Sequence, residues 1–385
     1  MRQPTCRACG AQTGDLVLDL GEQPACDYFP EQDDPGPDPR YPLQMWLCSS
    51  CGLAQLLVDP TIPEEPRGKE PAALVAQAAD AVARVAAAGL LPPRARVAEF
   101  GSPHGGSWLE QLACRGLVCT GGDEAVDVVL DCFGMMHAPD QAAGLRQRAA
   151  RVAPGGVLLL QYHSLDTIVR LGQWNALRHG HYAYYSTAAL VRMLETIGFR
   201  PRRAWRFELY GGTVLLAASR EADGPLDADA SVAALVEAEA LGGAGEPGVV
   251  GGLQVSARRH AAGLHDWLVA ERTAGRTVVG YGAASRAVSL LLQAGVDATL
   301  LPAVVDASPA KRGHRMPGTD IPIVAPSEIA WRRPSRILLF VPDLLAEVRR
   351  SFADVEASGG RWVNAETVRA WPPLEAASTS HLERA

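Results

Sequence analysis

Short apolar runs alternate with segments of helical periodicity between about residues 95 and 220. The apolar runs read ARVAEF, GLVC, AVDVVLDCF and PGGVLLLQY in chain order. Helices are expected near Ser107, at 139–152 and at 187–198, and RAWRFELY with GGTVLLAAS predicts a closing antiparallel pair. Strands that alternate with helices indicate a parallel sheet covered on both faces, so this region is expected to be an α/β domain.

The same alternation returns nearer the carboxyl end. An Ala-rich helix is predicted at 72–89 and a long helix at about 251–274. After the long helix, RTVVGYGAASRAVSLLL reads as strand, glycine turn and helix, and LPAVVDAS, IPIVAP, RILLFVP and RWVNAE supply further strands. These segments predict a second nucleotide-type α/β domain.

Polar, Pro- or Gly-rich segments separate three predicted domains. We place these domains at residues 1–58, 72–220 and 250–375. The connector at about 59–73 is Pro-rich, and the linker at about 221–250 is acidic and Gly-rich with a short helical middle.

Four of the eight cysteines stand in two C-x-x-C pairs, CRAC and CSSC, within the first 58 residues. Such paired spacing places four thiolates around one Zn²⁺, and an all-Cys site is structural because it keeps no open position. A redox C-x-x-C is the alternative, but it needs no second copy. The predicted zinc ligands are Cys6, Cys9, Cys48 and Cys51.

Composition narrows the classes of partner. The chain is 48% hydrophobic and 21% charged with a net charge of −7, which is typical of a globular protein and not of a nucleic-acid-binding surface. No signal peptide or membrane-spanning apolar run is evident. We therefore expect a cytoplasmic protein, where paired cysteines indicate metal or redox chemistry, and the Ala, Arg and Gly content suggests a bacterial source.

Two glycine turns are candidate ligand sites. In EFGSPHGG, Gly101 and Gly105 lie between a strand and a helix, and Asp123 ends the next strand, where a ribose hydroxyl is commonly bound. This pattern fits a dinucleotide or S-adenosylmethionine, and a turn needed only for packing is the alternative. In GYGAASR, Tyr281 and Gly282 form the second turn, and Arg286 can bind a diphosphate or be a solvated surface arginine.

The combination resembles the sugar C-methyltransferases of antibiotic deoxysugar pathways over almost the whole chain. The similarity rests on CRACG, LDLGEQPACDYF and YPLQMWLCSSCGLAQL near the start, and on VVGYGAASRAVSLLLQAGV and VVDASPAKRGHRMPGTDIPIVAPSEI near the end. The resemblance implies an α/β fold: a zinc-binding domain, a central S-adenosylmethionine-type Rossmann domain and a C-terminal Rossmann-like domain. It also implies a thymidine-diphosphate-linked 4-keto sugar as substrate, held by the central and C-terminal domains.

The segment RHGHYAYYS matches the region where that family carries Tyr-His-Glu-His. A base must remove a proton beside the ketone, and a polar group must stabilise the enolate before it attacks the sulfonium methyl. Here Arg178 replaces the Tyr and Gly180 the Glu, while both histidines remain. We predict His181 as the base, with His179 or Arg178 at the enolate oxygen. If the segment is extended, both histidines point to the same face. A polar cap over the following tyrosines is the structural alternative.

Other positions depart from the family in the central domain. His104 stands where the family's glycine turn carries Asp, Phe133 where it tends to show Asn, and the connector PEEPRGKEPAAL lacks the expected tyrosines. Only about three residues separate Asp123 from the strand VDVVLD, although a crossover needs at least about 10–12. One β/α unit, which builds part of the adenine pocket, is therefore expected to be missing.

Three functions remain open at this point. The chain is a C-methyltransferase for a nucleotide sugar, a repurposed epimerase, isomerase or lyase that forms the same enolate without S-adenosylmethionine, or a non-catalytic binding protein. The retained histidines argue against the third, and the missing adenine wall argues against the first.

Overall fold

The computed structural model describes residues 4–34, 36–61, 70–103, 105–221 and 229–368. The chain divides into two compact units, each formed by two separate segments. The first unit contains Met1–Tyr28 and Arg40–Gln254, and the second contains Phe29–Pro39 and Val255–Ala385. These units differ from the three ranges expected from the sequence, because the zinc-binding and central regions pack together in the first unit.

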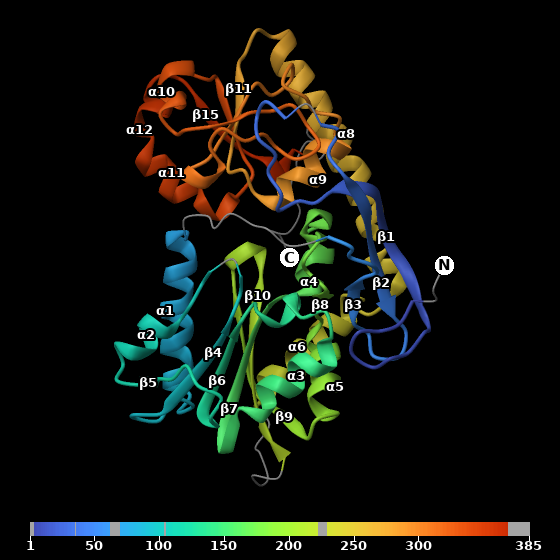
Figure 1. Cartoon of the computed structure of the whole chain (residues 1–385), viewed down its shortest axis with the longest axis vertical. Helices are drawn as coiled ribbons and strands as arrows, with labels where there is room; N and C mark the ends of the chain where they lie inside the picture. Colours follow the sequence, from blue (N-terminus) through green and yellow to red (C-terminus); the bar gives the residue numbers. More distant parts are fainter. Residues whose placement is uncertain (1–3, 35, 62–69, 104, 222–228, 369–385) are drawn as a thin grey trace, which may run out of the picture. The chain divides into compact units, whose positions relative to one another are not determined.

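The region that contains the cysteine pairs of the first unit forms a four-stranded antiparallel sheet, whose strands are labelled in Figure 1. Its order is β1-β2-β3-β8. The strands are β1 (Gly14–Pro24), β2 (Arg40–Cys48), β3 (Ala54–Leu56) and β8 (Ala183–Tyr184). The last strand follows RHGH directly, and Ala54 pairs with Tyr184. The zinc-binding region is therefore hydrogen-bonded to the segment that carries the predicted catalytic residues.

The central sheet of the first unit has the order β5-β4-β6-β7-β10-β9. Its strands are β4 (Arg96–Gly101), β5 (Val118–Cys119), β6 (Val126–Cys132), β7 (Val152–His163), β9 (Phe199–Phe207) and β10 (Thr213–Arg220). Four strands are parallel, and β9 and β10 close the sheet antiparallel, as the sequence predicts. The inner parallel strands β6 and β7 carry runs of buried Val and Leu because helices cover both of their faces.

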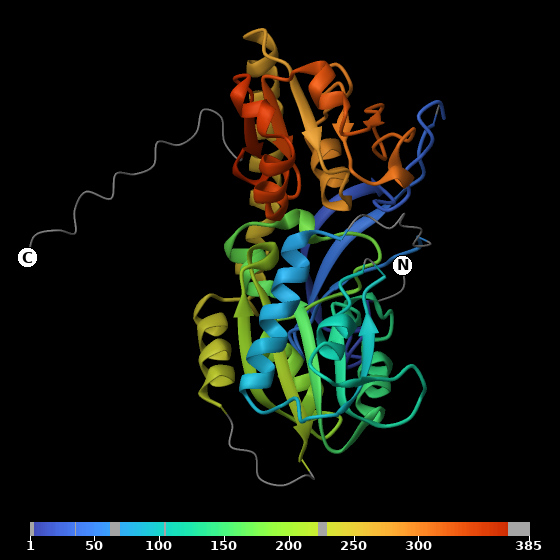
Figure 2. The same cartoon turned by 90° about the vertical axis from the view of Figure 1, so that its left-hand side faces the viewer.

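Helices flank both faces of this sheet (Figure 2), and two hydrophobic clusters lie between the sheet and these helices. On one face lie α1 (Ala72–Ala87) and α2 (Leu109–Ala113), with Ala81 and Leu112 in the core. On the other face lie α3 (Gln141–Ala150), α5 (Thr187–Glu195) and α6 (Ala230–Leu241). The expected linker at 221–250 thus contributes a packed helix. The short helices are α4 (Leu165–Arg170) and α7 (Pro247–Val250).

The central sheet ends at β5 within the described residues. Only residues 120–125 join β5 to β6, and β6 pairs with β4 on its other side. A further crossover helix and strand would need at least about 10–12 residues there. The prediction that one β/α unit is missing is confirmed.

The second unit has a five-stranded parallel sheet of order β13-β12-β11-β14-β15. Its strands are β11 (Val278–Tyr281), β12 (Val304–Val305), β13 (Ile323–Val324), β14 (Arg336–Leu339) and β15 (Arg361–Asn364). Its helices are α8 (Gly252–Thr273), α9 (Ser285–Gln293), α10 (Glu328–Arg332), α11 (Leu345–Ser351) and α12 (Ala353–Ala357), of which α8 starts in the first unit. Among the described helices, none has the length and apolarity to cross a membrane.

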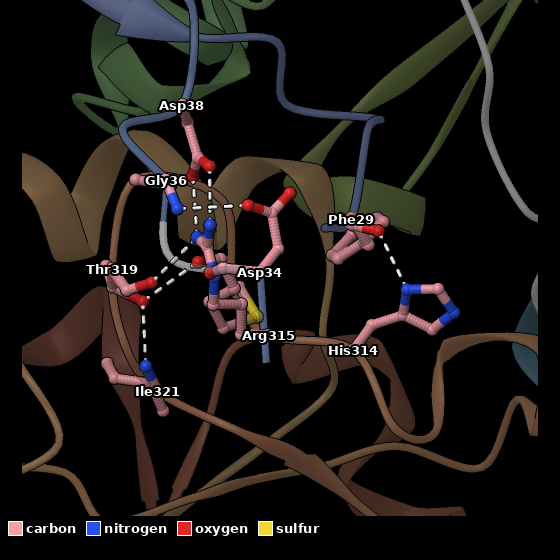
Figure 3. A network of polar contacts seen from close by, with 10 residues as sticks. Phe29, Asp34, Gly36, Asp38, His314, Arg315, Thr319 and Ile321 are labelled. Atoms are coloured by element: carbon pink, nitrogen blue, oxygen red, sulfur yellow. Dashed lines mark hydrogen bonds and ion pairs between the residues drawn. The ribbon is translucent and has the colours of Figure 1, made fainter. Parts of the chain in front are cut away.

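The segment Phe29–Pro39 leaves the β1–β2 hairpin and packs within the second unit (Figure 3). The guanidinium of Arg315 donates to both carboxylate oxygens of Asp38 at 2.7 Å, and both side chains are buried. His314 Nδ1 donates to the carbonyl of Phe29 at 2.8 Å. These contacts fix a polar segment that has no periodic pattern of its own.

Candidate active site

The four predicted zinc ligands come together in the first unit. Their sulfur atoms all lie within 4.8 Å of one another, with Cys6 and Cys51 at 3.5 Å and Cys9 and Cys48 at 3.7 Å. A tetrahedral Zn²⁺ with Zn–S bonds of about 2.3 Å requires sulfurs roughly 3.8 Å apart. Three of the four cysteines are buried. The cluster fits one structural Zn²⁺, and no open coordination position remains.

The first glycine turn follows β4 and is closed by an acid of that strand. The Glu99 carboxylate accepts hydrogen bonds from Ser107 Oγ at 2.5 Å and from the backbone N–H of Trp108 at 2.7 Å. Gly105 has φ +99°, in the left-handed region that favours glycine. A Cβ at Gly101 or Gly105 would meet no atom of the described residues within 4 Å, so the described part of the chain leaves open space beside the turn. His104 lies outside the described residues.

Asp123 follows the edge strand of the same sheet. Its side chain is exposed, and it comes after β5, whose neighbour β4 carries the glycine turn. Parallel neighbours end at the same edge, so both turns leave the sheet on one side. Gly101, Gly105 and Asp123 therefore all follow the carboxyl ends of neighbouring parallel strands. In open α/β sheets, nucleotide ligands bind at these strand ends.

The segment Arg178–His181 forms a tight turn and is not extended. The N–H of His181 donates to the carbonyl of Arg178 at 3.3 Å, and Gly180 has φ +80°. The turn brings Arg178 Nε to 2.7 Å from His181 Nε2, which accepts its hydrogen. Both side chains are half-buried.

A second histidine faces His181, and sequence reasoning did not select it as a site residue. His137 lies in a short 3-10 turn after β6 (Met135–His137), and its ring centroid is 4.7 Å from that of His181. Its Nδ1 donates to the carbonyl of Gly180 at 2.9 Å, which leaves Nε2 as the acceptor, 3.5 Å from Ser102 Oγ. Burial and the charge of Arg178 lower the pKa of His137 to about 3. His137 is therefore a neutral imidazole that connects the glycine turn to the RHGH turn.

A buried ion pair holds the turn that carries His137. Asp131, at the end of β6, is fully buried and accepts from the N–H of Met135 at 2.9 Å. Arg148 of α3 donates to its other oxygen at 2.5 Å and lies over the ring of Phe100. Burial raises the pKa of Asp131 and outweighs the nearby charge of Arg148, which acts to lower it. The signal in the sequence for this ion pair was an acid near the end of an apolar strand, directly after the buried run Val128–Leu130.

His179 points away from His181 toward the zinc-binding sheet. Its Nε2 donates to the carbonyl of Pro42 at 3.3 Å, and its ring lies edge-on to that of Tyr41. Burial lowers its pKa, so it is neutral near pH 7. The extended arrangement that would place both histidines on one face is wrong, because the left-handed Gly180 separates them.

The tyrosines after the turn anchor it. Tyr184 OH donates to the carbonyl of Ala176 at 3.2 Å and accepts from the N–H of Arg178 at 3.1 Å. Tyr185 bonds the side chain of Gln141 in α3. Burial raises the pKa of both phenols. These tyrosines hold the turn in place, whereas Arg178 and His181 lie half-buried at its surface.

The residues selected in the second unit are held by neighbours. Tyr281 is buried against Phe352 and Trp362, and burial raises its pKa to about 12. Gly282 has φ +91°. Arg286 forms an ion pair with Glu366 at 3.0 Å. The turn geometry expected from GYGAASR is present, and the Arg286 guanidinium is oriented by an acid.

Family models match three successive segments of the chain. Residues 6–61 match a zinc binding domain, residues 72–203 a methyltransferase domain and residues 208–365 a C-methyltransferase C-terminal domain. The chain is also 23% identical to the C-methyltransferase NovU of Streptomyces niveus, over 93% of this chain and 94% of that protein.

Solved structures resemble a smaller part of the chain. A magnesium protoporphyrin IX methyltransferase from Synechocystis is 18% identical with a TM-score of 0.29, and covers 38% of this chain and 84% of its own. A 1,6-didemethyltoxoflavin-N1-methyltransferase from Burkholderia thailandensis is 17% identical with a TM-score of 0.27, and covers 45% of this chain and 97% of its own.

Proposed function

We propose that this chain, which belongs to the family of C-methyltransferases with a zinc-binding N-terminal domain, methylates a carbon of a nucleotide-diphosphate keto-deoxysugar through an enolate. Thymidine diphosphate is the proposed nucleotide, and antibiotic deoxysugar synthesis the proposed context. The observation that carries the proposal is the cluster of Arg178, His181 and His137 beside the glycine turn after β4.

The cluster offers the two groups that enolate formation needs. A guanidinium carries five N–H donors, so Arg178 can hold His181 through Nε and the ketone oxygen of the substrate through its terminal nitrogens. When the substrate oxygen draws the guanidinium toward it, Nε2 of His181 is released to accept the proton from the adjacent carbon. Arg178 then stabilises the negative charge that develops on oxygen.

S-adenosylmethionine would supply the methyl group as an electrophilic sulfonium. Gly101, Gly105 and Asp123 are the residues proposed to hold it. The open space beside Gly101 and Gly105 supports this assignment, because a bound group can approach the backbone of the turn there. In this proposal His181 and Arg178 prepare the carbon nucleophile, and the turn after β4 orients the methyl donor toward it.

A second candidate function is enolate chemistry without methyl transfer, as in an epimerase, isomerase or lyase. It is favoured by the central sheet ending at β5, because the unit that normally follows builds part of an adenine pocket. Both candidates share the base and the oxyanion group, and they differ in whether S-adenosylmethionine binds.

The test is exchange of solvent deuterium into a thymidine-diphosphate 4-keto sugar in the absence of S-adenosylmethionine. The native protein should catalyse exchange, and His181→Ala should lose it while keeping its circular dichroism spectrum. His265→Ala is the matched control, because that histidine bonds the carbonyl of Ala294 in the second unit. Native-like exchange by His181→Ala would contradict the assignment of the base. Calorimetric titration with S-adenosylmethionine then separates the two candidate functions.

A further inference from the structure

Three buried hydrogen-bond acceptors near the RHGH turn have no protein donor among the described residues. They are Oδ1 of Asp27, Nδ1 of His179 and Oε1 of Gln23. Their residues are only 6%, 2% and 2% exposed. Native proteins pair nearly all buried polar atoms, so the unpaired oxygen of Asp27 and the unpaired nitrogen of His179, beside one turn, indicate a function.

All of these atoms are hydrogen-bond acceptors. His179 Nε2 lies 3.3 Å from the Pro42 carbonyl, which only accepts, so the ring proton is on Nε2 and Nδ1 offers a lone pair. Asp27 lies close enough to raise the pKa of His179 by its charge, although burial outweighs it and lowers that pKa overall. A partner for this cluster must therefore be a hydrogen-bond donor.

Gly180 opens a space beside Asp27. A Cβ built on Gly180 would meet only Oδ2 of Asp27, at 3.9 Å. The N–H of Gly180 donates to Asp59 at 2.6 Å, and its carbonyl accepts from His137 at 2.9 Å. The backbone of Gly180 is thus fixed on both sides, and the space over Gly180 faces the Asp27 carboxylate.

We propose that the space over Gly180 is a substrate subsite in which Asp27 accepts a hydrogen bond from a hydroxyl or ammonium group on the sugar ring. The inference rests on the proposed function, because it places that group on the sugar whose ketone meets Arg178. Cys26 hydrogen-bonds the Asp27 side chain, but Oδ1 of Asp27 is buried without a donor among the described residues. Such an oxygen favours a substrate that brings a donor, because hydrogen bonds to charged acceptors are the stronger kind. Asp27 is therefore a specificity-determining residue.

The first arm of the test needs no substrate. Asp27→Asn removes, at constant shape, a buried charge of which one oxygen has no donor among the described residues. The melting temperature of the ligand-free protein should therefore equal or exceed that of the native chain. Asp15→Asn is the matched control, because Asp15 is an exposed carboxylate in β1, the strand that precedes Asp27. A fall of more than about 5 °C in Asp27→Asn alone would show a structural role and overturn the proposal.

The second arm compares three thymidine-diphosphate 4-keto sugars that carry a hydroxyl, an amino group or only hydrogen next to the ketone. In Asp27→Asn the KM for deuterium exchange should rise about tenfold or more for the amino sugar, less for the hydroxyl sugar, and not for the deoxy sugar. The larger of the two effects identifies the donor. Equal changes for all three sugars would overturn the subsite.

Binding separates this inference from the function on which it rests. If the native protein binds a donor-bearing sugar in an Asp27-dependent way but catalyses no exchange, the proposed chemistry fails and the subsite stands. If calorimetry detects no binding of any donor-bearing sugar to the native protein, the subsite is overturned as well.

Discussion

Arg178 Nε donates its hydrogen to Nε2 of His181 across 2.7 Å. The Nε2 lone pair that His181 would use as a base is therefore hydrogen-bonded to the Arg178 cation until another acceptor binds the guanidinium in its place. A ketone oxygen is such an acceptor. This pairing links proton removal to substrate binding, because the base is released by the group that must be polarised.

Arg178→Ala should lower the rate of deuterium exchange at saturating sugar by about 100-fold, because the enolate oxygen loses its charged donor. KM should change less, since the interaction grows as charge develops. Arg178→Lys should recover only part of the rate, because an ammonium lacks the planar fork that reaches two acceptors. Arg170→Ala is the control, with a side chain 56% exposed. Native rates in Arg178→Ala would contradict the assignment.

His137 should destabilise the protein in mild acid. Its pKa is about 3 when folded and about 6.5 when unfolded, so only the unfolded chain takes up a proton as the pH falls through this window. The free energy of unfolding is then lost progressively from about pH 6.5 toward pH 3. His137→Gln should lose less stability than the native chain over the accessible part of that range. Urea unfolding midpoints at pH 7, 5.5 and 4.5 test this. An equal fall of the midpoint with pH in the native chain and in His137→Gln would contradict it.

The pair of Asp131 and Arg148 should show strong coupling. Arg148→Met leaves a buried carboxylate without its cation and should cost about 3–5 kcal/mol of unfolding free energy. Adding Asp131→Asn should restore much of that loss, because the amide oxygen can still accept from the N–H of Met135 and no charge remains. Urea unfolding of both single variants and the double variant measures the coupling. Additive losses would show that the two side chains act separately.

Much of the fold could be predicted because its signals are local. Apolar runs mark the buried strands of both parallel sheets, and the cysteine pairs mark the metal cluster. The missing unit could be predicted from length alone, since residues 120–125 are too few for a crossover. The strands and the missing unit depend only on residues that are neighbours in sequence. The metal cluster depends on paired cysteines, which mostly bind a metal at this spacing.

The site was less predictable because its contacts are distant. His137 meets the RHGH turn only because Asp131 and Arg148 fix the turn after β6, and no periodic pattern encodes that. The left-handed Gly180, which sends His179 and His181 apart, depends on a backbone angle that glycine permits without requiring. Likewise, the polar composition of Phe29–Pro39 gives no sign that this segment packs within the second unit.

Loss of zinc should reach the active site as well as the first strands. Native protein purified without chelator should contain about one zinc per chain, and Cys48→Ser should contain less. Because β3 pairs with β8 directly after RHGH, unfolding of the cysteine region should also reduce deuterium exchange. Elemental analysis and exchange rates on the same samples test both statements. Cys114→Ser, at an exposed cysteine outside the cluster, is the control. Zinc-free native protein with full activity would contradict the prediction.

Arg286 should bind the diphosphate of the sugar nucleotide. Its guanidinium is held by Glu366 at 3.0 Å, and both side chains are less than one fifth exposed. Arg286→Ala should weaken thymidine diphosphate binding about tenfold, because a charge-assisted hydrogen bond is lost. Glu366→Gln should strengthen binding, because it removes the carboxylate that competes with the phosphate. Arg332→Ala, at an exposed ion pair with Glu328, is the control. Calorimetric titration with thymidine diphosphate measures the affinity of all four proteins. Equal affinities in the native and Arg286→Ala chains would contradict binding of the diphosphate at the turn of Tyr281 and Gly282.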